Sequence, residues 1–306
     1  MPGQLTLLDT PSLWYRAFHG VPESVTAPDG SPVNAVRGTI DLIARIVRDT
    51  RPARLVACLD LDWRPAFRVA AVASYKAHRL ADNGAEAEPA SLSGQVGVLL
   101  EVLDAIGIAT AGVEGYEADD VLGTLSAREA GAVDVVTGDR DMFQLVRDEG
   151  PVRVLYTVDK LAPYTPGTVA AKYGISGTAY AEYAVLRGDP SDGLPGVKGV
   201  GDKTAAALVS RFGTVEGILA ALDTGEQDGF PAGARAKLEA ARAYLAVAPA
   251  VTRAVRDLPV PELSDVLPRG PRDPARLVAL SDRWGLDSPL DRLLRALETA
   301  ADRPGG

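Results

Sequence analysis

The stretch VDVVTGD, residues 133–139, decides the fold. A run of β-branched apolar residues ends there in a glycine and an aspartate, the pattern of a buried strand with an acidic side chain at its carboxyl end. Helical patterns at 35–48 and 93–106 separate further strands of this kind. These strands are LTLLD (5–9), LVACLD (55–60) and VRVLY (152–156). The alternation predicts an α/β fold, with a mostly parallel central sheet and helices on both faces.

Three of these four strands end in an aspartate, namely Asp9, Asp60 and Asp139. In open α/β sheets, ligands bind beyond the carboxyl ends of the parallel strands. Each aspartate alone is equally well explained as a turn residue or as the N-cap of the next helix. Three of them at one edge of the sheet favour a functional site.

Further carboxylates follow in three short clusters. GYEADDV (115–121) predicts a helix that begins near Glu117, and acids in a first helical turn also interact favourably with the helix dipole. TGDRDMFQL (137–145) repeats the arrangement after a strand, and GDPSDGLPG (188–196) on its own would be an exposed turn. Strand ends and clusters together contain nine carboxylates: Asp9, Asp60, Glu117, Asp119, Asp120, Asp139, Asp141, Asp189 and Asp192.

The net charge of −9 argues at first sight against a nucleic-acid partner. Without those nine carboxylates, however, the remaining 32 acids equal the 32 Lys and Arg residues. A set of oxygen ligands suits Mg²⁺ or Mn²⁺, whereas two histidines and one cysteine are too few for the usual zinc sites. Two such ions about 4 Å apart can activate water and stabilise the leaving oxygen of a phosphodiester.

The remaining composition excludes other classes of protein. The single cysteine, Cys58, rules out an intrachain disulfide framework and lies in an apolar run typical of a buried side chain. No apolar stretch reaches the roughly 18 to 20 residues of a membrane span, and the N-terminus lacks the pattern of a signal peptide. We therefore expect a cytoplasmic protein with no membrane partner.

A basic segment follows Asp60, with no acid between Trp63 and Ala81. As one helix, it would gather its four cations and one tyrosine within an arc of roughly 120°. Such a face suits a nucleic-acid backbone and a stacked base, although a solvated surface helix has the same pattern. The residues concerned are Arg64, Arg68, Tyr75, Lys76 and Arg79.

A glycine hairpin lies in GVKGVGDKTAAALVSRFG, residues 196–213. It precedes a helix that is expected to begin near Asp202 and to end at Gly213. Glycines allow a phosphate to approach the backbone, and the N–H groups at a helix start can bind an anion. The candidate DNA contacts are Gly196, Lys198, Gly199, Gly201, Lys203 and Thr204.

Taken in order, these motifs resemble the bacterial 5′-to-3′ exonucleases of the flap endonuclease superfamily, including the N-terminal nuclease domain of bacterial DNA polymerase I. The resemblance rests on DTPSLWYRAF, CLD, FRVAAVASYKAHR, GYEADDV, TGDRDMFQL and GDPSDGLPGVKGVGDKTA, spread over residues 5–222. It implies a structure-specific nuclease with 5′-3′ exonuclease and 5′-flap endonuclease activity in DNA replication and repair. The nine carboxylates would then be direct or water-mediated ligands of two or three Mg²⁺ or Mn²⁺ ions.

The same resemblance implies roles for the basic residues. Lys76 and Arg79 would act at the reacting phosphate, and Tyr75 would lie near the unpaired nucleotides. The hairpin would belong to a helix-two-turn-helix element at about 194–222, which grips duplex DNA and in relatives holds K⁺. The expected substrates are DNA flaps, nicks and free 5′ ends, and a stand-alone nuclease would work beside a separate polymerase or ligase.

The resemblance also implies a domain organisation. An α/β domain with a PIN-like or resolvase-like nuclease fold would span residues 1–175, with a helical arch at about 63–95. From about residue 176 the pattern itself becomes helical with no convincing strand, so an all-α region is expected at 176–306, and the resemblance implies that it binds DNA. Near its end, LVALSDRWGL and LDRLLRALE are predicted to form helices that pack back on the body.

The chain departs from the family pattern in two places. Thr10 and Pro11 stand where glycine usually follows the first aspartate, and Gly193 stands where asparagine is usual. Loss of that amide is expected to loosen Asp192, which leaves a catalytically silent DNA-junction binder as one alternative. A ribonuclease of the related PIN class is another, against which the hairpin and the basic segment argue.

Overall fold

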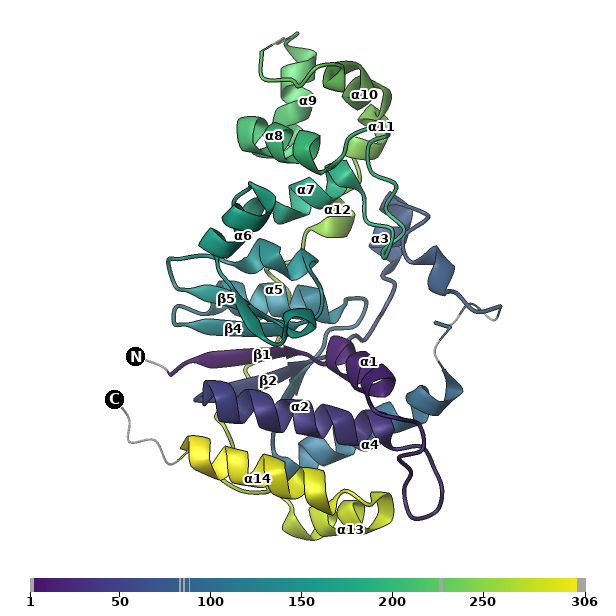
Figure 1. Cartoon of the computed structure of the whole chain (residues 1–306), viewed down its shortest axis with the longest axis vertical. Coiled ribbons are helices and arrows are strands. Elements are labelled where there is room, and N and C mark those ends of the chain that lie inside the picture. Colours follow the sequence, from purple (N-terminus) through teal and green to yellow (C-terminus); the bar gives the residue numbers. More distant parts are fainter. Residues whose placement is uncertain (1–2, 83, 85, 88, 226–227, 302–306) are drawn as a thin grey trace.

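The computed structural model describes residues 3–82, 84, 86–87, 89–225 and 228–301 (Figure 1). Its centre is a six-stranded sheet in the order β3-β2-β1-β4-β5-β6. The strands are β1 (Leu5–Asp9), β2 (Arg54–Cys58), β3 (Ala109–Ala111), β4 (Val133–Thr137), β5 (Val152–Tyr156) and β6 (Ala162–Tyr164). Only β6 pairs antiparallel to its neighbour. The predicted α/β fold is confirmed, although β3 and β6, of three residues each, gave too short an apolar run to be recognised.

The order of the strands reverses at β1. From this strand the chain builds outward through β2 and β3 on one side, then returns to add β4, β5 and β6 on the other. Leu8 lies opposite both Ala57 of β2 and Val136 of β4 in parallel register. Such a reversal opens a crevice at the carboxyl ends of the central strands.

Helices cover both faces of the sheet. Neighbouring side chains of β1 point to opposite faces and therefore belong to two different cores. Leu8 packs in a core formed by helices on one face, whereas Leu7 belongs to the core on the other face. The Leu8 face carries α1 (Thr10–Gly20), α2 (Asn34–Thr50), α4 (Ala90–Ile106), α13 (Pro274–Trp284) and α14 (Asp287–Ala301). The Leu7 face carries α5 (Ala118–Arg128). The predicted helices at 35–48 and 93–106 are thus α2 and α4.

After β6 the described residues contain no further strand, as the sequence predicted. Short helices follow: α6 (Pro166–Tyr173), α7 (Tyr180–Arg187), α8 (Asp202–Phe212), α9 (Val215–Asp223), α10 (Ala234–Ala240), α11 (Arg242–Leu245) and α12 (Pro249–Thr252). Helices α8 to α11 form one end of the molecule, farthest from α13 and α14 (Figure 1). Among the described helices, none is by itself long and apolar enough to cross a membrane; α8 and α9 reach that length only as a pair, bent by 76°.

The chain then returns to the sheet. Arg54 on β2 forms an ion pair of 2.7 Å with Asp265, and the two last helices pack against α2 and α4. Leu293 and Leu297 of α14 are fully buried in that contact. The prediction that the C-terminal helices pack back on the body is confirmed, so the sheet domain draws part of its core from the end of the chain.

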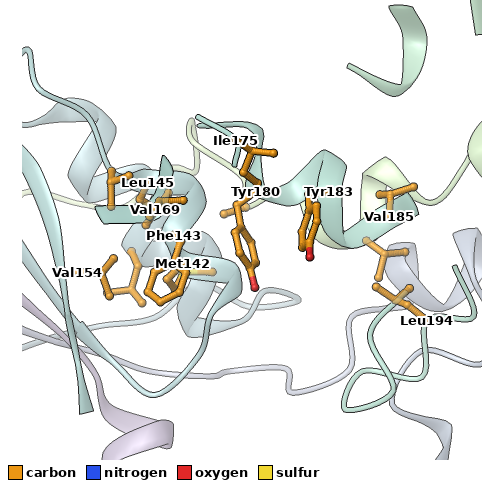
Figure 2. Close-up of a cluster of buried hydrophobic side chains, with 14 of the residues drawn as sticks. Met142, Phe143, Leu145, Val154, Val169, Ile175, Tyr180, Tyr183, Val185 and Leu194 are labelled. Carbon is orange, nitrogen blue, oxygen red and sulfur yellow. The ribbon is translucent and has the colours of Figure 1, made fainter. Parts of the chain in front are cut away.

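An aromatic cluster joins the sheet to the helical end (Figure 2). Phe143, in the 3-10 turn η2 (Asp141–Leu145), stacks on Tyr164 of β6 with ring centroids 4.5 Å apart, and it meets Tyr180 of α7 edge-on at 5.4 Å. The same apolar seam continues through Val185 to Leu194. Because such packing is rigid, it fixes both η2 and the loop after α7 relative to the sheet.

Candidate metal centre and nucleic-acid interface

An acidic pocket of about 370 Å³ lies at the carboxyl ends of β1, β2 and β4. Its described walls contain seven carboxylates, Asp9, Asp60, Glu86, Glu117, Asp119, Asp139 and Asp189, against three cations, Lys76, Arg79 and Arg140. The structure therefore brings six of the nine predicted carboxylates to one pocket, together with both predicted catalytic cations.

Asp9 ends β1 and also begins α1. Its Oδ1 accepts a hydrogen bond from the backbone N–H of Ser12 at 3.2 Å, and its Oδ2 accepts one from Thr137 Oγ1 at 2.5 Å. Burial raises the pKa of Asp9 to about 7, against the effect of the Thr137 bond. The N-cap interpretation of this aspartate is thus confirmed, and the cap fixes the orientation of the carboxylate at the pocket.

Asp60, just after β2, and Asp119, on α5, face the same space. Asp60 accepts a hydrogen bond from the N–H of Ala118 at 2.6 Å, and burial raises its pKa to about 6 although Lys76 lowers it. Burial, and then repulsion from Asp139 and Asp9, raises the pKa of Asp119 well above its ordinary value. These carboxylates are close enough to repel one another without full compensation.

Glu117 and Asp120 cap α5 reciprocally, since each side chain accepts from the backbone of the other. Glu117 nevertheless reaches the pocket, whereas Asp120 points away from it. Both oxygens of Asp120 accept from the guanidinium of Arg68, at 2.7 and 2.8 Å, and Oδ1 also accepts from the N–H of Val255 at 2.9 Å. The structure thus places Asp120 fully buried behind the pocket, although the resemblance implies a direct or water-mediated metal ligand at this position.

A second group of acids lies between η2 and the loop after α7. The N–H of Asp141 donates to Asp139 Oδ1 at 2.8 Å, and burial raises the pKa of Asp141 well above its usual value, with further contributions from Asp139, Asp192 and Asp189. Burial likewise raises the pKa of Asp192 to about 6. Neither Asp141 nor Asp192 lines the pocket wall itself. Asp139, which raises the pKa of both Asp119 and Asp141, lies between the two groups.

These residues fit divalent cations by their chemistry. All donors are oxygens, and Asp141 Oδ1 is buried without a hydrogen-bond partner. Seven carboxylates against three cations leave an excess of negative charge that a hard cation would offset. Among the described residues, no three of these side chains form a ready-made site for one ion.

The basic segment differs from the single helix that was expected. Helix α3 (Ala66–Ala71) ends before Val72, and a 3-10 turn, η1 (Ala77–Arg79), follows a left-handed Lys76. The backbone turn separates the cations, so they share no continuous face. Lys76 binds Glu117 in the pocket, and Arg79 donates to Asp192 Oδ1 at 3.3 Å.

Two predicted DNA contacts of this segment lie inside the protein. Arg68 is 2 % exposed and pairs with Glu117 at 2.5 Å in addition to Asp120, while Tyr75 is 3 % exposed and donates to Glu117 Oε2 at 2.7 Å. Their spacing suggested a DNA-facing surface. Instead, Arg68 and Tyr75 donate hydrogen bonds to the buried carboxylates of Glu117 and Asp120, whose burial without partners would be costly. Arg64 is partly exposed, and its Nε donates to the carbonyl of Tyr75 at 2.6 Å.

The sequence did not single out some residues of the site. Trp63 and Tyr15 line the pocket, and Trp63 accepts a hydrogen bond from Lys76 Nζ through its carbonyl at 3.4 Å. In the sequence, only the position of Trp63 three residues after Asp60, and of Tyr15 six residues after Asp9, could have indicated that they belong to the site. Of the two departures, Thr10 is fully buried at the start of α1, so it adds no polar group to the pocket, which Pro11 lines instead.

The glycine hairpin lies where the sequence predicted, before a helix, α8, that begins at Asp202 and is followed by Gly213. Lys198, Gly199, Gly201 and Lys203 are exposed, and Thr204 is half-buried. Gly196 allows close packing of the backbone, because a β-carbon there would lie 2.5 Å from the backbone nitrogen of Gly188. Lys237, which the sequence did not indicate, donates to the Gly199 carbonyl at 2.8 Å and adds a third cation to the hairpin.

Comparison with known proteins agrees with this arrangement. The 5′-3′ exonuclease family model for the N-terminal resolvase-like domain matches residues 4–174, and the model for the C-terminal SAM fold matches residues 175–274. A 5′-3′ exonuclease of Streptomyces coelicolor is 56 % identical over 299 residues, which cover 95 % of this chain and 99 % of that protein. DNA polymerase I of Mycobacterium leprae is 37 % identical over 98 % of this chain, which corresponds to 32 % of the polymerase.

Solved structures share the fold. The bacteriophage T5 D15 flap endonuclease, crystallised with DNA and metal ions, superimposes with a TM-score of 0.62 at 16 % identity, over 98 % of this chain and 100 % of the phage protein. At this level of identity the likeness concerns the fold alone. The matched family models and the high identity to the Streptomyces protein show more: this chain belongs to the 5′-3′ exonuclease family.

Proposed function

We propose that this protein is a structure-specific nuclease that hydrolyses DNA from 5′ ends and cuts 5′ flaps in replication and repair, leaving a 5′-phosphate and a 3′-hydroxyl. The observation that carries the proposal is the acidic pocket, in which seven carboxylates face Lys76 and Arg79. Free 5′ ends, nicks and flaps are the substrates, and a separate polymerase or ligase in the cytoplasm would act on the same DNA.

Each side chain has a defined task in this proposal. Asp9, Asp60, Glu117, Asp119, Asp139 and Asp189 hold two or three Mg²⁺ or Mn²⁺ ions, and Asp141 and Asp192 act through water from their places behind the wall. When bound, such ions supply Lewis-acid activation of water and neutralise charge at the phosphate. Lys76 and Arg79 stabilise negative charge on the reacting phosphate. Asp120 serves indirectly, because it holds Arg68 against Glu117.

The hairpin supplies the grip on duplex DNA. Exposed Lys198 and Lys203, with the N–H groups at the start of α8, suit a phosphate backbone and carry no base-specific group. We include K⁺ at this element as part of the proposal. One carbonyl of the turn, that of Gly199, already accepts from Lys237, so K⁺ would use the other carbonyls.

The test is cleavage of a labelled 5′ DNA flap in EDTA, Mg²⁺ or Mn²⁺. We expect cutting near the junction only with metal, and loss of roughly a thousandfold in Asp119→Asn, because one transition-state ligand interaction of about 4 kcal/mol corresponds to that factor. Asp291→Asn removes a carboxylate on α14 that is 69 % exposed and remote from the pocket, and should cut normally.

Two other outcomes would decide against the proposal. Tight flap binding with no cutting in any metal would make the protein a silent junction binder, the alternative that Thr10 and Gly193 raise. Faster cleavage of an RNA strand than of DNA in the same flap would favour a PIN-type ribonuclease.

A further inference from the structure

The segment that follows α3 is fastened to the loop after α7. The N–H of Lys76 donates to the carbonyl of Asp192 at 2.9 Å, and Ser74 Oγ donates to the carbonyl of Gly193 at 2.7 Å. Arg79 Nη2 donates to the carbonyl of Ser191 at 2.9 Å. All three acceptors are backbone carbonyls of consecutive residues, so residues 74–79 lie along residues 191–193 (Figure 1).

This close approach depends on Gly193. A β-carbon on Gly193 would overlap the carbonyl oxygen of Ser74, and it would lie 3.1 Å from the Ser74 carbonyl carbon and 3.4 Å from the Lys76 nitrogen. Its φ of 71° alone does not demand glycine, since asparagine also adopts left-handed backbone. Contact with Ser74 is therefore what excludes a side chain, at a position where the resemblance to the family leads one to expect asparagine.

The contact determines where an ammonium group lies. Lys76 has a left-handed backbone, with φ 47°, which a lysine rarely adopts without tertiary restraint. In this conformation its side chain is 11 % exposed and its Nζ binds Glu117 inside the acidic pocket. Arg79 is held at the rim by the same loop.

We infer that residues 74–79 and 191–193 form a latch that seats the basic segment on the acidic pocket, and that Gly193 is the positioning residue that permits it. Lys76 and Arg79 are consequently held in place by contacts within the chain. Because the latch consists of these contacts alone, it goes beyond the proposed nuclease function, and its test needs neither DNA nor metal.

The measurement is hydrogen exchange of backbone amides in the protein without DNA or metal. In the wild type, the Lys76 amide should be protected, because it donates to Asp192 in a buried contact. In Gly193→Asn, exchange across 74–79 should be at least about tenfold faster while the amides of β1 and β4 keep their rates. Gly30→Asn is the matched control: Gly30 also has a positive φ, 87°, but a β-carbon there meets nothing within 4 Å.

A second variant keeps the test decisive if Gly193→Asn does not fold. Ser74→Ala removes only the 2.7 Å bond to the Gly193 carbonyl, and it should speed exchange in 74–79 about three- to tenfold, as expected for one lost hydrogen bond. With flap DNA and Mg²⁺, both variants should lower kcat more than they raise KM, because the hairpin that grips the duplex is untouched.

The inference fails if residues 74–79 of the wild type exchange as fast as an unstructured peptide. It also fails if neither variant accelerates exchange in this segment, or if Gly30→Asn accelerates it equally. None of these results would change the expectation that the wild type cleaves DNA in the presence of metal. The latch and the nuclease proposal are therefore tested independently.

Discussion

The acids of the pocket and the basic segment that covers it differ in how the chain positions them. Asp9, Asp60 and Asp139 follow directly from strand ends, and the parallel order of β2, β1 and β4 brings them together. The cations of the basic segment do not lie at strand ends. They are positioned by ion pairs with residues far away in sequence, such as that of Arg68 with Asp120. Residues at the ends of regular elements are thus placed by local pattern, whereas residues in irregular segments are placed by tertiary pairing.

If strand-end acids serve chemistry rather than the fold, removing one should destroy activity and spare stability. We expect Asp139→Asn to reduce flap cleavage by about a thousandfold or more, since a lost metal interaction of several kcal/mol has that effect. Its melting temperature should stay or rise, because burial and the nearby Asp189 raise the pKa of Asp139 and so disfavour its charged form. Single-turnover cleavage and thermal melts measure the two quantities. A large loss of stability would mean that Asp139 is structural.

For Arg68 we expect the opposite, a loss of stability on substitution. It is 2 % exposed and pairs with Glu117 and Asp120, so Arg68→Met should leave buried Asp120 without a cation and Glu117 with Lys76 alone, and cost about 3–5 kcal/mol of unfolding free energy. Urea denaturation measures this loss. The double variant with Asp120→Asn should recover part of it, because the unpaired charge of Asp120 is then gone. If Arg68→Met instead kept its stability and lost only DNA affinity, the surface role suggested by the sequence would be restored.

The sequence predicted the central strands, α2, α4, the start of α5 and the convergence of the strand-end acids, because all of these follow from local periodicity and from the rule for parallel sheets. It did not predict β3 or β6, whose three residues carry too little pattern. Nor could it place Arg68 and Tyr75 inside, since a cation and an aromatic have the same spacing on a DNA-binding face and in a buried network. Gly193 shows the same limit: its partner, Ser74, is 119 residues away.

The buried acids in and behind the pocket should also make the metal-free protein less stable at high pH. Burial raises the pKa of Asp9 to about 7 and those of Asp60 and Asp192 to about 6, each from 3.8. The folded state then binds more protons than the unfolded chain between about pH 4 and 7, so its stability falls as pH rises through that range. In EDTA we expect the unfolding free energy to be roughly 3 kcal/mol higher at pH 5 than at pH 8, well below the sum of the individual shifts because the groups interact.

Metal provides the control for this pH dependence. Mg²⁺ binds the ionised carboxylates, so a saturating concentration should stabilise the protein most at pH 8 and flatten the profile. Urea denaturation at the two pH values, with EDTA or with Mg²⁺, measures both effects. A metal-free protein that became more stable as pH rose from 5 to 8 would show that the strand-end acids are already neutralised by the chain's own cations, and the contrast between the two regions would disappear.

The hairpin limits the comparison, because its candidate DNA contacts are local in sequence, as the strand-end acids are, yet Lys198, Gly199 and Lys203 are exposed. Lys203 lies in the first turn of α8 on the surface, so Lys203→Ala should leave stability unchanged. Flap affinity should fall about three- to tenfold and the salt dependence of binding should weaken by roughly one ion, as for one lost phosphate contact. Binding titrations in Ca²⁺ at several salt concentrations measure this, with Arg295→Ala on α14, 79 % exposed, as the control of equal charge. Equal losses in the two variants would indicate that overall charge, rather than the hairpin, holds the duplex.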